Sequence, residues 1–215
     1  MFLLSKELFF PPLDMADEDG LLAIGGDLST ERLLLAYRSG IFPWYNEMDP
    51  ICWWSPDPRF VLYPGELKVS NSMRTVLQNG RFKFTINKTF EQVMQLCKTV
   101  PRKGQDGTWI SAAMLDAYSL LHKLGYAHSA ETWLNGELVG GLYGIRLGNI
   151  FFGESMFSLK TNASKFAFIN YVRQLQKEGV LLIDCQLHTD HLESLGAKMI
   201  PRKLFIEILA ANTGQ

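Results

Sequence analysis

The feature that most constrains the fold is a run of strand-like segments between residues 127 and 157. The segments are 127–134, 137–147 and 150–157. Asn135-Gly136 separates the first two and Gly148-Asn149 the last two. Such dipeptides readily adopt the positive φ angles of two-residue hairpin loops. The sequence therefore predicts an antiparallel meander of three strands.

A helix and one more strand are predicted after the meander. Residues 161–179 have apolar side chains at helical spacing, with Thr161 or Asn162 as the cap and Gly179 at the end. Residues 180–187, "VLLIDCQL", form an apolar run typical of a buried strand. A strand that returns to its sheet through a helix lies parallel to its neighbour. We therefore expect a mixed sheet and an α+β fold class.

One strand and two helices are expected ahead of the meander. Apolar and polar residues alternate over 81–86, which indicates a strand. Thr89 and Gln92 form a capping-box signature at the start of a helix that ends near Thr99. The second helix is expected over 111–124.

The N-terminal part of the chain has a different pattern. A helix is predicted from its cap at Ser29 to Gly40. Residues 40–60 then contain four prolines and three tryptophans, which indicates an ordered, aromatic-lined loop region. We expect a small N-terminal domain at 1–62 and a larger domain at 63–215.

Composition excludes several classes of protein. The cysteines Cys52, Cys97 and Cys185 are odd in number and far apart, which argues against a disulfide framework or a structural zinc site. No apolar run approaches the roughly 20 residues of a membrane span, and the N-terminus lacks a signal-peptide pattern. We expect a cytoplasmic protein.

The charge is unevenly distributed, although the net charge is only −1. Between residues 70 and 103, Glu91 alone opposes a set of basic residues. They are Arg74, Arg81, Lys83, Lys88, Lys98, Arg102 and Lys103. This stretch is basic enough to bind a polyanion. Trp44, Trp53, Trp54 and Trp109 could stack on nucleotide bases, although tryptophans are more often part of a core.

The stretch "LLIDCQLH" contains the most reactive residue types. Side chains alternate on a strand, so Asp184 and Gln186 are expected on one face and Cys185 on the apolar face between Ile183 and Leu187. Because no nearby cation or base would lower its pKa, Cys185 is interpreted as a small buried hydrophobe. Asp184 and Gln186 lie near the end of a parallel strand, where ligand sites gather in open sheets. Capping of the strand end is the alternative.

Two further motifs carry polar candidates. In "FFGESMF", Glu154 lies in an apolar strand, so it should be paired or functional. A carboxylate hydrogen-bonded to backbone is the alternative, and we favour a site. "HTDH" at 188–191 offers two histidines and one acid, which is a weak metal signal without another ligand.

Eight separated motifs together resemble the leucyl/phenylalanyl-tRNA–protein transferase family. They are "DGLLAIGGDLSTERLLLAYRSGIFPW", "WWSPDPR", "GTWI", "LVGGLYG", "FFGESMFS", "NASK", "DCQ" and "SLGAKMIPR". The likeness spans the chain from about Phe10 to Phe205. It implies a small N-terminal domain and a GNAT-like, acetyltransferase-related domain. It also implies transfer of Leu or Phe, and Met as well, from aminoacyl-tRNA to proteins with N-terminal Arg or Lys, which marks them for degradation by the N-end rule pathway.

The resemblance also implies roles for individual residues. Asp184 and Gln186 match a catalytic Asp-x-Gln pair, and Glu154 matches an acid in the substrate pocket. An apolar pocket for the aminoacyl side chain is expected near Leu142, Phe151, Phe168, Tyr171 and Ile183. Aromatic residues around the terminal adenosine are expected at Trp44, Trp109 and Tyr118. The tRNA body is assigned to Arg74, Arg81, Lys83 and Lys88. We expect no metal and no cofactor, and a monomer.

A chemical hypothesis follows from the resemblance. The α-amine of the acceptor has an unperturbed pKa of roughly 7.7 to 8.0, so it needs only modest base assistance near neutral pH. We expect Asp184 to orient and polarise Gln186, whose carbonyl oxygen accepts a hydrogen bond from the amine. Glu154 could help to hold the amine or the basic side chain of the acceptor.

Two other functions are weighed against this one. An acyl-CoA N-acyltransferase on the same fold would need a glycine- and arginine-rich loop for the coenzyme's pyrophosphate, and the predicted helix opens with "TNASK" instead. A noncatalytic RNA-binding module could use the basic stretch and the tryptophans, but it would leave Glu154, Asp184 and Gln186 without a role.

Overall fold

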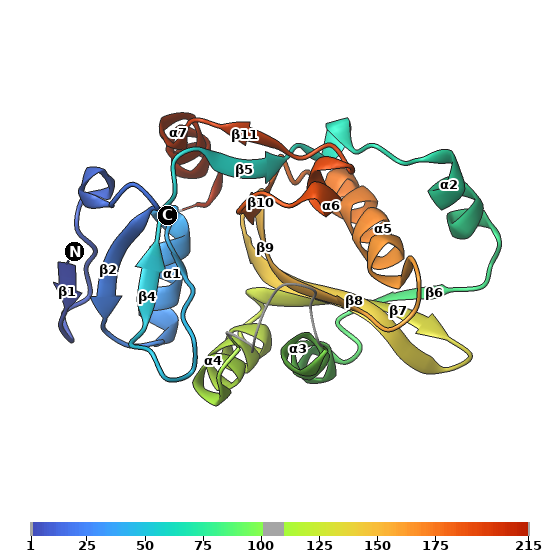
Figure 1. The fold of residues 1–215 in the computed structure, drawn as a ribbon, viewed down its shortest axis with the longest axis horizontal. Coiled ribbons are helices and arrows are strands. Elements are labelled where there is room, and N and C mark those ends of the chain that lie inside the picture. Colours follow the sequence, from blue (N-terminus) through green and yellow to red (C-terminus); the bar gives the residue numbers. More distant parts are fainter. Residues whose placement is uncertain (1, 101–109, 215) are drawn as a thin grey trace.

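The computed structural model describes residues 2–100 and 110–214, and its elements are arranged around two sheets (Figure 1). In the smaller sheet the strands follow the order β1-β2-β4-β3. They are β1 (Phe2–Leu4), β2 (Leu21–Gly25), β3 (Phe42–Pro43) and β4 (Cys52–Trp54). The sequence predicts loops in part of this region, because strands this short are below the length at which alternation can be detected.

The larger sheet has the strand order β11-β5-β10-β9-β8-β7-β6. Its strands are β5 (Arg59–Leu62), β6 (Lys83–Ile86), β7 (Ala127–Leu134), β8 (Glu137–Leu147), β9 (Ile150–Ser158), β10 (Leu182–Gln186) and β11 (Lys198–Ile200). β7, β8 and β9 form the predicted antiparallel meander, and β10 pairs in parallel with β9. The expected mixed sheet and α+β class are confirmed.

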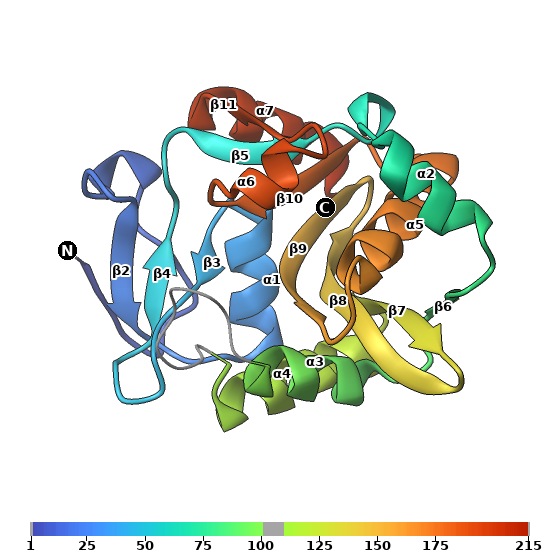
Figure 2. The same ribbon diagram turned by 45° about the vertical axis from the view of Figure 1, so that its right-hand side comes forward.

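Helices cover both faces of the larger sheet (Figures 1 and 2). The α-helices are α1 (Thr30–Arg38), α2 (Asn71–Gln78), α3 (Phe90–Thr99), α4 (Ala112–Lys123), α5 (Ala163–Lys177), α6 (Asp190–Glu193) and α7 (Arg202–Asn212). Short 3-10 helices are η1 (Leu13–Met15) and η2 (Pro64–Glu66). α5 packs on one face of the meander, and α3 and α4 pack on the other. The sheet is therefore buried on both sides.

The predicted helix starts are correct in position, and two of the caps differ in detail. The Ser29 hydroxyl accepts a hydrogen bond from the backbone N of Arg32, as expected of an N-cap. Thr89 makes no such bond and instead donates to the side-chain oxygen of Gln92, so the capping box is wrong. Asn162 begins α5 with a left-handed φ of 67° and no side-chain cap.

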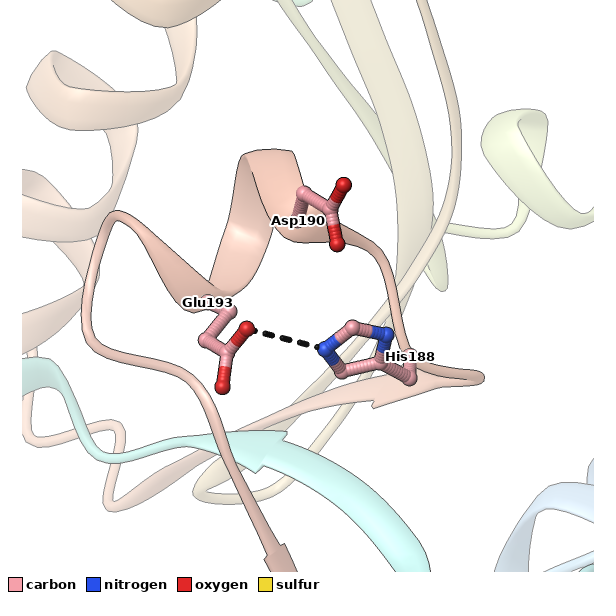
Figure 3. Close-up of side chains that lie close together, drawn as sticks. All are labelled: His188, Asp190 and Glu193. Carbon is pink, nitrogen blue, oxygen red and sulfur yellow. Dashed lines mark hydrogen bonds and ion pairs between the residues drawn. The ribbon is translucent and has the colours of Figure 1, made fainter.

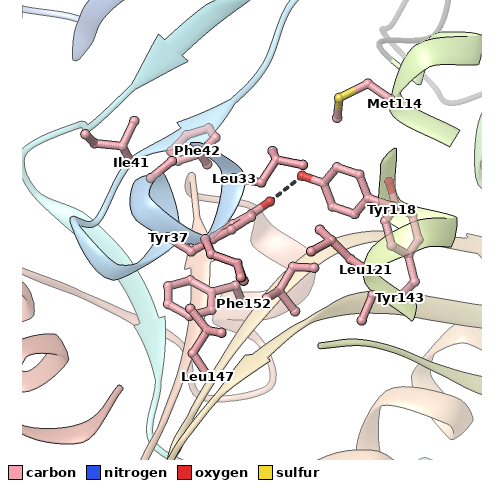
Figure 4. Close-up of a cluster of buried hydrophobic side chains, with 14 of the residues drawn as sticks. Leu33, Tyr37, Ile41, Phe42, Met114, Tyr118, Leu121, Tyr143, Leu147 and Phe152 are labelled. Atoms are coloured by element: carbon pink, nitrogen blue, oxygen red, sulfur yellow. Dashed lines mark hydrogen bonds between the residues drawn. The ribbon is translucent and has the colours of Figure 1, made fainter. Parts of the chain in front are cut away.

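The sheets change between β4 and β5, slightly before the expected boundary after residue 62. β5 pairs with β10 and β11, so it belongs to the larger sheet. One hydrophobic cluster also crosses between the sheets, with Leu33 and Tyr37 of α1 beside Tyr118 of α4 and Phe152 of β9 (Figure 4). Because this core is shared, the division into two domains stays a prediction.

Candidate active site

A cavity of about 430 Å³ opens where β9 and β10 separate. The two strands pair only over 150–152 and 182–184. Beyond this point, 153–158 of β9 form one wall of the cavity and 185–187 another. Residues from β3, β8, α5 and the segment 187–192 complete the lining.

The apolar part of the cavity contains most of the expected side-chain pocket. Leu142, Phe151, Phe168 and Ile183 all line it. Tyr171 lies behind this wall, with its ring edge-on to Phe151 at 5.1 Å between ring centroids. Four of the five residues predicted for this pocket therefore meet in one place.

Two β-bulges shape the polar end of the cavity. In β9, Tyr143 pairs with Ser155 and Gly144 with Gly153, which leaves Glu154 as an extra residue. The face of the strand changes at this bulge, because Phe152 and Phe157 belong to the same hydrophobic cluster although they are five residues apart. Bulges of this kind re-aim side chains and are common beside active sites.

The second bulge lies in β10, directly beside the first. Asp184 is opposite Val61 of β5 and Gln186 is opposite Phe60, so Cys185 is the extra residue. Gln186 has a φ of 58°, which is uncommon for a residue other than glycine. The expectation that Asp184 and Gln186 share one face by simple alternation is therefore wrong.

Glu154 is the hub of the polar contacts. Its Oε1 accepts hydrogen bonds from the Tyr37 hydroxyl at 2.7 Å and from the Gln186 amide nitrogen at 3.1 Å, and its Oε2 lies 3.4 Å from the Tyr118 hydroxyl. Burial raises the pKa of Glu154 to about 8, against the opposing effect of the Tyr37 hydrogen bond. Glu154 is thus largely protonated at neutral pH.

The two tyrosines form a buried pair, and their hydroxyls are hydrogen-bonded to each other (Figure 4). Burial and the Glu154 carboxyl raise the pKa of both phenols well above the ordinary value. A tyrosine hydroxyl has only one proton, so with Tyr37 donating to Glu154, Tyr118 donates to Tyr37. Tyr118 is 0% exposed and does not line the cavity. Its ring is therefore enclosed, unlike that of an aromatic residue expected around an adenosine.

Gln186 is held at both ends. Its backbone N donates to Oδ1 of Asp184 at 3.0 Å, and its side-chain nitrogen donates to Glu154. Because the nitrogen of the amide is used by Glu154, the amide carbonyl oxygen is left for another donor. Gln186 lines the cavity, so this acceptor is positioned at its polar end.

Asp184 does not line the cavity and is 0% exposed. Both of its carboxylate oxygens bind Arg59, at 2.8 Å from Nε and 2.6 Å from Nη2. Arg59 also donates to the Gly40 carbonyl at 3.2 Å. The prediction that Asp184 orients the side chain of Gln186 is corrected in one respect. Asp184 binds the backbone N–H of Gln186, whereas Glu154 binds the side chain of Gln186.

Cys185 lines the cavity beside Ile183 and belongs to the apolar cluster under α5. Burial and the nearby Asp184 raise the pKa of its thiol far above the ordinary value. A thiol that stays protonated is a poor nucleophile. The interpretation of Cys185 as a buried hydrophobe is therefore supported.

The remaining aromatic candidates have different outcomes. Trp44 lines the cavity, and its carbonyl accepts a hydrogen bond from the indole of Trp54 at 2.7 Å. Trp109 lies outside the described residues. Trp53 is fully buried, so it belongs to the core.

The four predicted tRNA contacts are exposed and lie in the segment that contains α2 and the edge strand β6. Arg74 lies on α2, Lys83 on β6, and Arg81 and Lys88 on the flanking loops. The Lys88 ammonium lies 4.6 Å from the centre of the Trp133 ring. Strands β9, β8 and β7 separate β6 from β10, a distance of about 19 Å at usual strand spacing.

The "HTDH" segment forms a small surface cluster. His188, Asp190 and Glu193 lie close together, and His188 Nε2 is 3.1 Å from Glu193 (Figure 3). His191 instead lines the cavity. Exposed groups of this kind are common without a metal, so the cluster adds no support for a metal site.

Two site residues were not singled out in the sequence. Arg59 lies in "WWSPDPR", where a charged residue begins an otherwise apolar strand. Tyr37 lies on the apolar face of α1, where its hydroxyl gives no periodic signal. Within the described part of the chain, no helix has the length and apolar composition needed to cross a bilayer.

Breaking the Arg59–Asp184 pair should destabilise the fold strongly. Arg59→Met keeps apolar contact with Phe42 and Phe205, whose rings lie 4.7 Å from the guanidinium, but leaves Asp184 buried without its partner. We expect a loss of about 3–5 kcal/mol in the free energy of unfolding, measured by urea denaturation. Lys198→Met, which removes an exposed pair with Glu66, should cost at most about 1 kcal/mol. Similar losses in the two variants would contradict this assignment.

Glu154→Gln should change how stability depends on pH. The pKa of Glu154 is about 8 in the folded protein against an ordinary value of 4.5. Between these pH values Glu154 carries a proton in the folded protein and loses it on unfolding, so a rising pH favours the unfolded state. The contribution of Glu154 to the wild-type free energy of unfolding is therefore complete below pH 4.5 and is lost as the pH rises to 8. Urea titrations at pH 5, 7 and 9 should show that the free energy of unfolding of the variant rises relative to that of the wild type as the pH increases to about 8. Parallel curves would disprove the raised pKa.

Comparison with known proteins identifies the family. A sequence profile described as "Leucyl/phenylalanyl-tRNA protein transferase" matches residues 61–210, and the profile of its N-terminal domain matches residues 26–57. The chain is 57% identical over 212 residues to the leucyl/phenylalanyl-tRNA–protein transferase of Syntrophobacter fumaroxidans, covering 99% of this chain and 91% of the relative. The Flavobacterium johnsoniae transferase is also 57% identical, covering 99% and 100%.

A solved structure of a GCN5-related N-acetyltransferase from Kribbella flavida aligns over 76% of this chain and 57% of that one. The identity is 10% and the TM-score 0.37, so no conclusion rests on this similarity. The family profiles and the two relatives are sufficient to assign the family without this structure. The chain therefore belongs to the leucyl/phenylalanyl-tRNA–protein transferase family and is an aminoacyltransferase.

Proposed function

We propose that this enzyme transfers Leu or Phe, and Met as well, from aminoacyl-tRNA to the α-amine of proteins that begin with Arg or Lys. The observation that carries the proposal is the position of Gln186, fixed at both ends beside an apolar cavity. The product would enter degradation by the N-end rule pathway in the cytoplasm.

The apolar wall suits the aminoacyl side chain. Leu142, Phe151, Phe168 and Ile183 offer it no polar side chain, and each buried methylene contributes about 0.8 kcal/mol. Small amino acids should therefore be excluded more strongly than other large apolar ones. Trp44, at the β3 side of the cavity, is the described candidate for contact with the terminal nucleotide.

The chemistry requires positioning more than activation. The neutral α-amine attacks the ester carbonyl, an amide bond forms, and the ester C–O bond breaks to leave the ribose hydroxyl. The carbonyl oxygen of Gln186 accepts a hydrogen bond from the amine, whose proton ultimately goes to the ribose oxygen. Asp184 and Glu154 act by fixing Gln186. These steps require neither ATP nor a metal.

The basic side chain of the acceptor and the body of the tRNA bind at separate places in this proposal. Among the described residues that line the cavity, Glu154 is the acidic one, and a cation beside it would favour its ionised form. The exposed Arg74, Arg81, Lys83 and Lys88 would hold tRNA phosphates, in contacts that salt weakens.

A transfer assay tests the donor and the acceptor together. Labelled leucyl-tRNA or acetyl-CoA is incubated with the enzyme and with peptides that differ only in an N-terminal Arg or Ala. We expect label on the Arg peptide from the tRNA alone, with a tRNA KM that rises with salt. Transfer from acetyl-CoA would favour an acyl-CoA N-acyltransferase, and binding without transfer a noncatalytic RNA-binding module.

Gln186→Ala should lower the single-turnover rate by about 100-fold at saturating substrates, because it removes the acceptor for the amine proton. Gln95→Ala, which changes an exposed glutamine on α3, is the matched control and should keep the rate. Full activity in Gln186→Ala would disprove this role. A folded Cys185→Ala variant without activity would instead indicate a catalytic role for Cys185.

A further inference from the structure

The end of α1 contacts the polar groups of the site at two points. The Tyr37 hydroxyl donates a hydrogen bond to Oε1 of Glu154 at 2.7 Å. Further along the chain, the Gly40 carbonyl accepts a hydrogen bond from Arg59, which in turn binds Asp184. Because α1 precedes every strand of the larger sheet, the N-terminal part of the chain contributes directly to the site.

The ring and the hydroxyl of Tyr37 have different surroundings. The ring packs in the core, tilted against Phe152 with 5.0 Å between the ring centroids. Phenylalanine would provide the same packing, because the ring contacts involve only carbon atoms. The hydroxyl instead contacts Glu154 and the hydroxyl of Tyr118, and Tyr37 is 0% exposed. The hydroxyl therefore makes contacts that packing does not require.

Tyr37, Tyr118 and Glu154 can satisfy one another in a closed ring of hydrogen bonds. Burial raises the pKa of Glu154 to about 8, so at neutral pH its carboxyl group carries one proton and can donate as well as accept. Tyr118 donates to Tyr37, and Tyr37 donates to Oε1 of Glu154. The carboxyl proton then lies on Oε2, which is 3.4 Å from the Tyr118 hydroxyl and can donate to it. Each of the three groups donates once and accepts once.

We propose that the Tyr37 hydroxyl orients the side-chain amide of Gln186 through Glu154, and that Tyr37 is thus a positioning residue for the transfer. Oε1 of Glu154 accepts from the Gln186 nitrogen at 3.1 Å as well as from Tyr37. Both acceptor positions of Oε1 are then filled, so the carboxyl proton stays on Oε2. The nitrogen end of the amide therefore faces Glu154, and the carbonyl oxygen is left for the attacking amine.

Loss of the Tyr37 hydrogen bond would remove this selection. The carboxyl proton can then move to Oε1, which donates to the amide oxygen of Gln186 and turns the amide round. The oxygen that should accept from the attacking amine is then occupied by Glu154. The inference rests on the proposed function and deepens it, because it names the group that fixes the orientation of Gln186.

The kinetic test is a double-mutant cycle with Gln186→Ala. Tyr37→Phe should lower the single-turnover rate at saturating substrates by about threefold to tenfold, with the acceptor KM within about twofold of the wild-type value. Because Tyr37 acts through Gln186, adding Tyr37→Phe to Gln186→Ala should change the rate by less than about twofold. An unchanged rate in Tyr37→Phe, or losses that multiply in the double variant, overturn the proposal.

Tyr45→Phe is the matched control. It removes the hydroxyl of another partly buried tyrosine in the N-terminal part of the chain, which lies 3.4 Å from Oγ of Ser111. Its single-turnover rate should stay within about twofold of the wild-type rate. Equal losses in Tyr45→Phe and Tyr37→Phe would show a general effect of removing a hydroxyl, and would overturn the proposal.

A second readout needs no substrate. In isotopically labelled enzyme, the side-chain NH2 protons of Gln186 are assigned by their loss in Gln186→Ala. Nuclear Overhauser effects between these protons and the Cγ protons of Glu154 are expected in the wild type and in Tyr45→Phe. They should weaken in Tyr37→Phe, and also in Tyr118→Phe, which opens the ring of hydrogen bonds at its other tyrosine.

Either of these two variants is sufficient for the decision, should the other fail to fold. Undiminished Overhauser effects in a folded Tyr37→Phe or Tyr118→Phe variant overturn the proposal. If the wild-type enzyme does not transfer Leu to the Arg peptide, the proposed function fails instead. The Overhauser measurement then still decides whether Tyr37 orients the amide of Gln186.

Discussion

The buried ion pair between Arg59 and Asp184 is the interaction on which the site depends. Arg59 binds both carboxylate oxygens of Asp184, donates to the Gly40 carbonyl and lies against the rings of Phe42 and Phe205. It thereby joins β5, β10, the end of α1, β3 and α7. Two desolvated charges are tolerated here because the guanidinium and the carboxylate match in a bidentate geometry.

The Asp184 carboxylate also connects this ion pair to the residues that line the cavity. Asp184 Oδ1 accepts a hydrogen bond from the backbone of Gln186, and the Gln186 amide donates to Glu154. Glu154 in turn accepts from Tyr37, whose hydroxyl bonds to Tyr118. The chain of contacts runs from a buried cation to α4. Two of its members, Glu154 and Gln186, line the cavity, and no described residue donates a hydrogen bond to the amide oxygen of Gln186.

The walls of the site carry little charge at neutral pH. Burial raises the pKa of Glu154 to about 8 and keeps Cys185 and the two tyrosines protonated. The full charges lie behind the wall, in the pair of Arg59 and Asp184. An apolar side chain can therefore enter beside the polar groups at small desolvation cost, while hydrogen bonds in this low-dielectric environment orient the reacting amine.

The sequence alone determined the elements whose signals are local. The turns at 135–136 and 148–149 specify the meander, the apolar period specifies α5, and the helix between the two strands specifies that β10 is parallel to β9. Glu154 and Gln186, which the family resemblance assigns to one site, are hydrogen-bonded to each other. Leu142, Phe151, Phe168 and Ile183, on three strands and one helix, also meet as expected.

The tertiary structure alone decided which way the polar side chains point. Alternation predicts that Asp184 and Gln186 share a face, but an extra residue in β10 and another in β9 change the face of each strand. A bulge is set by the register between strands that are distant in sequence, so no local pattern reveals it. The partner of Asp184 is equally non-local, since Arg59 is 125 residues away and meets it only when β5 joins the sheet. Hydrophobic periodicity thus specifies the layers, whereas cross-strand register and desolvated pairing specify the site.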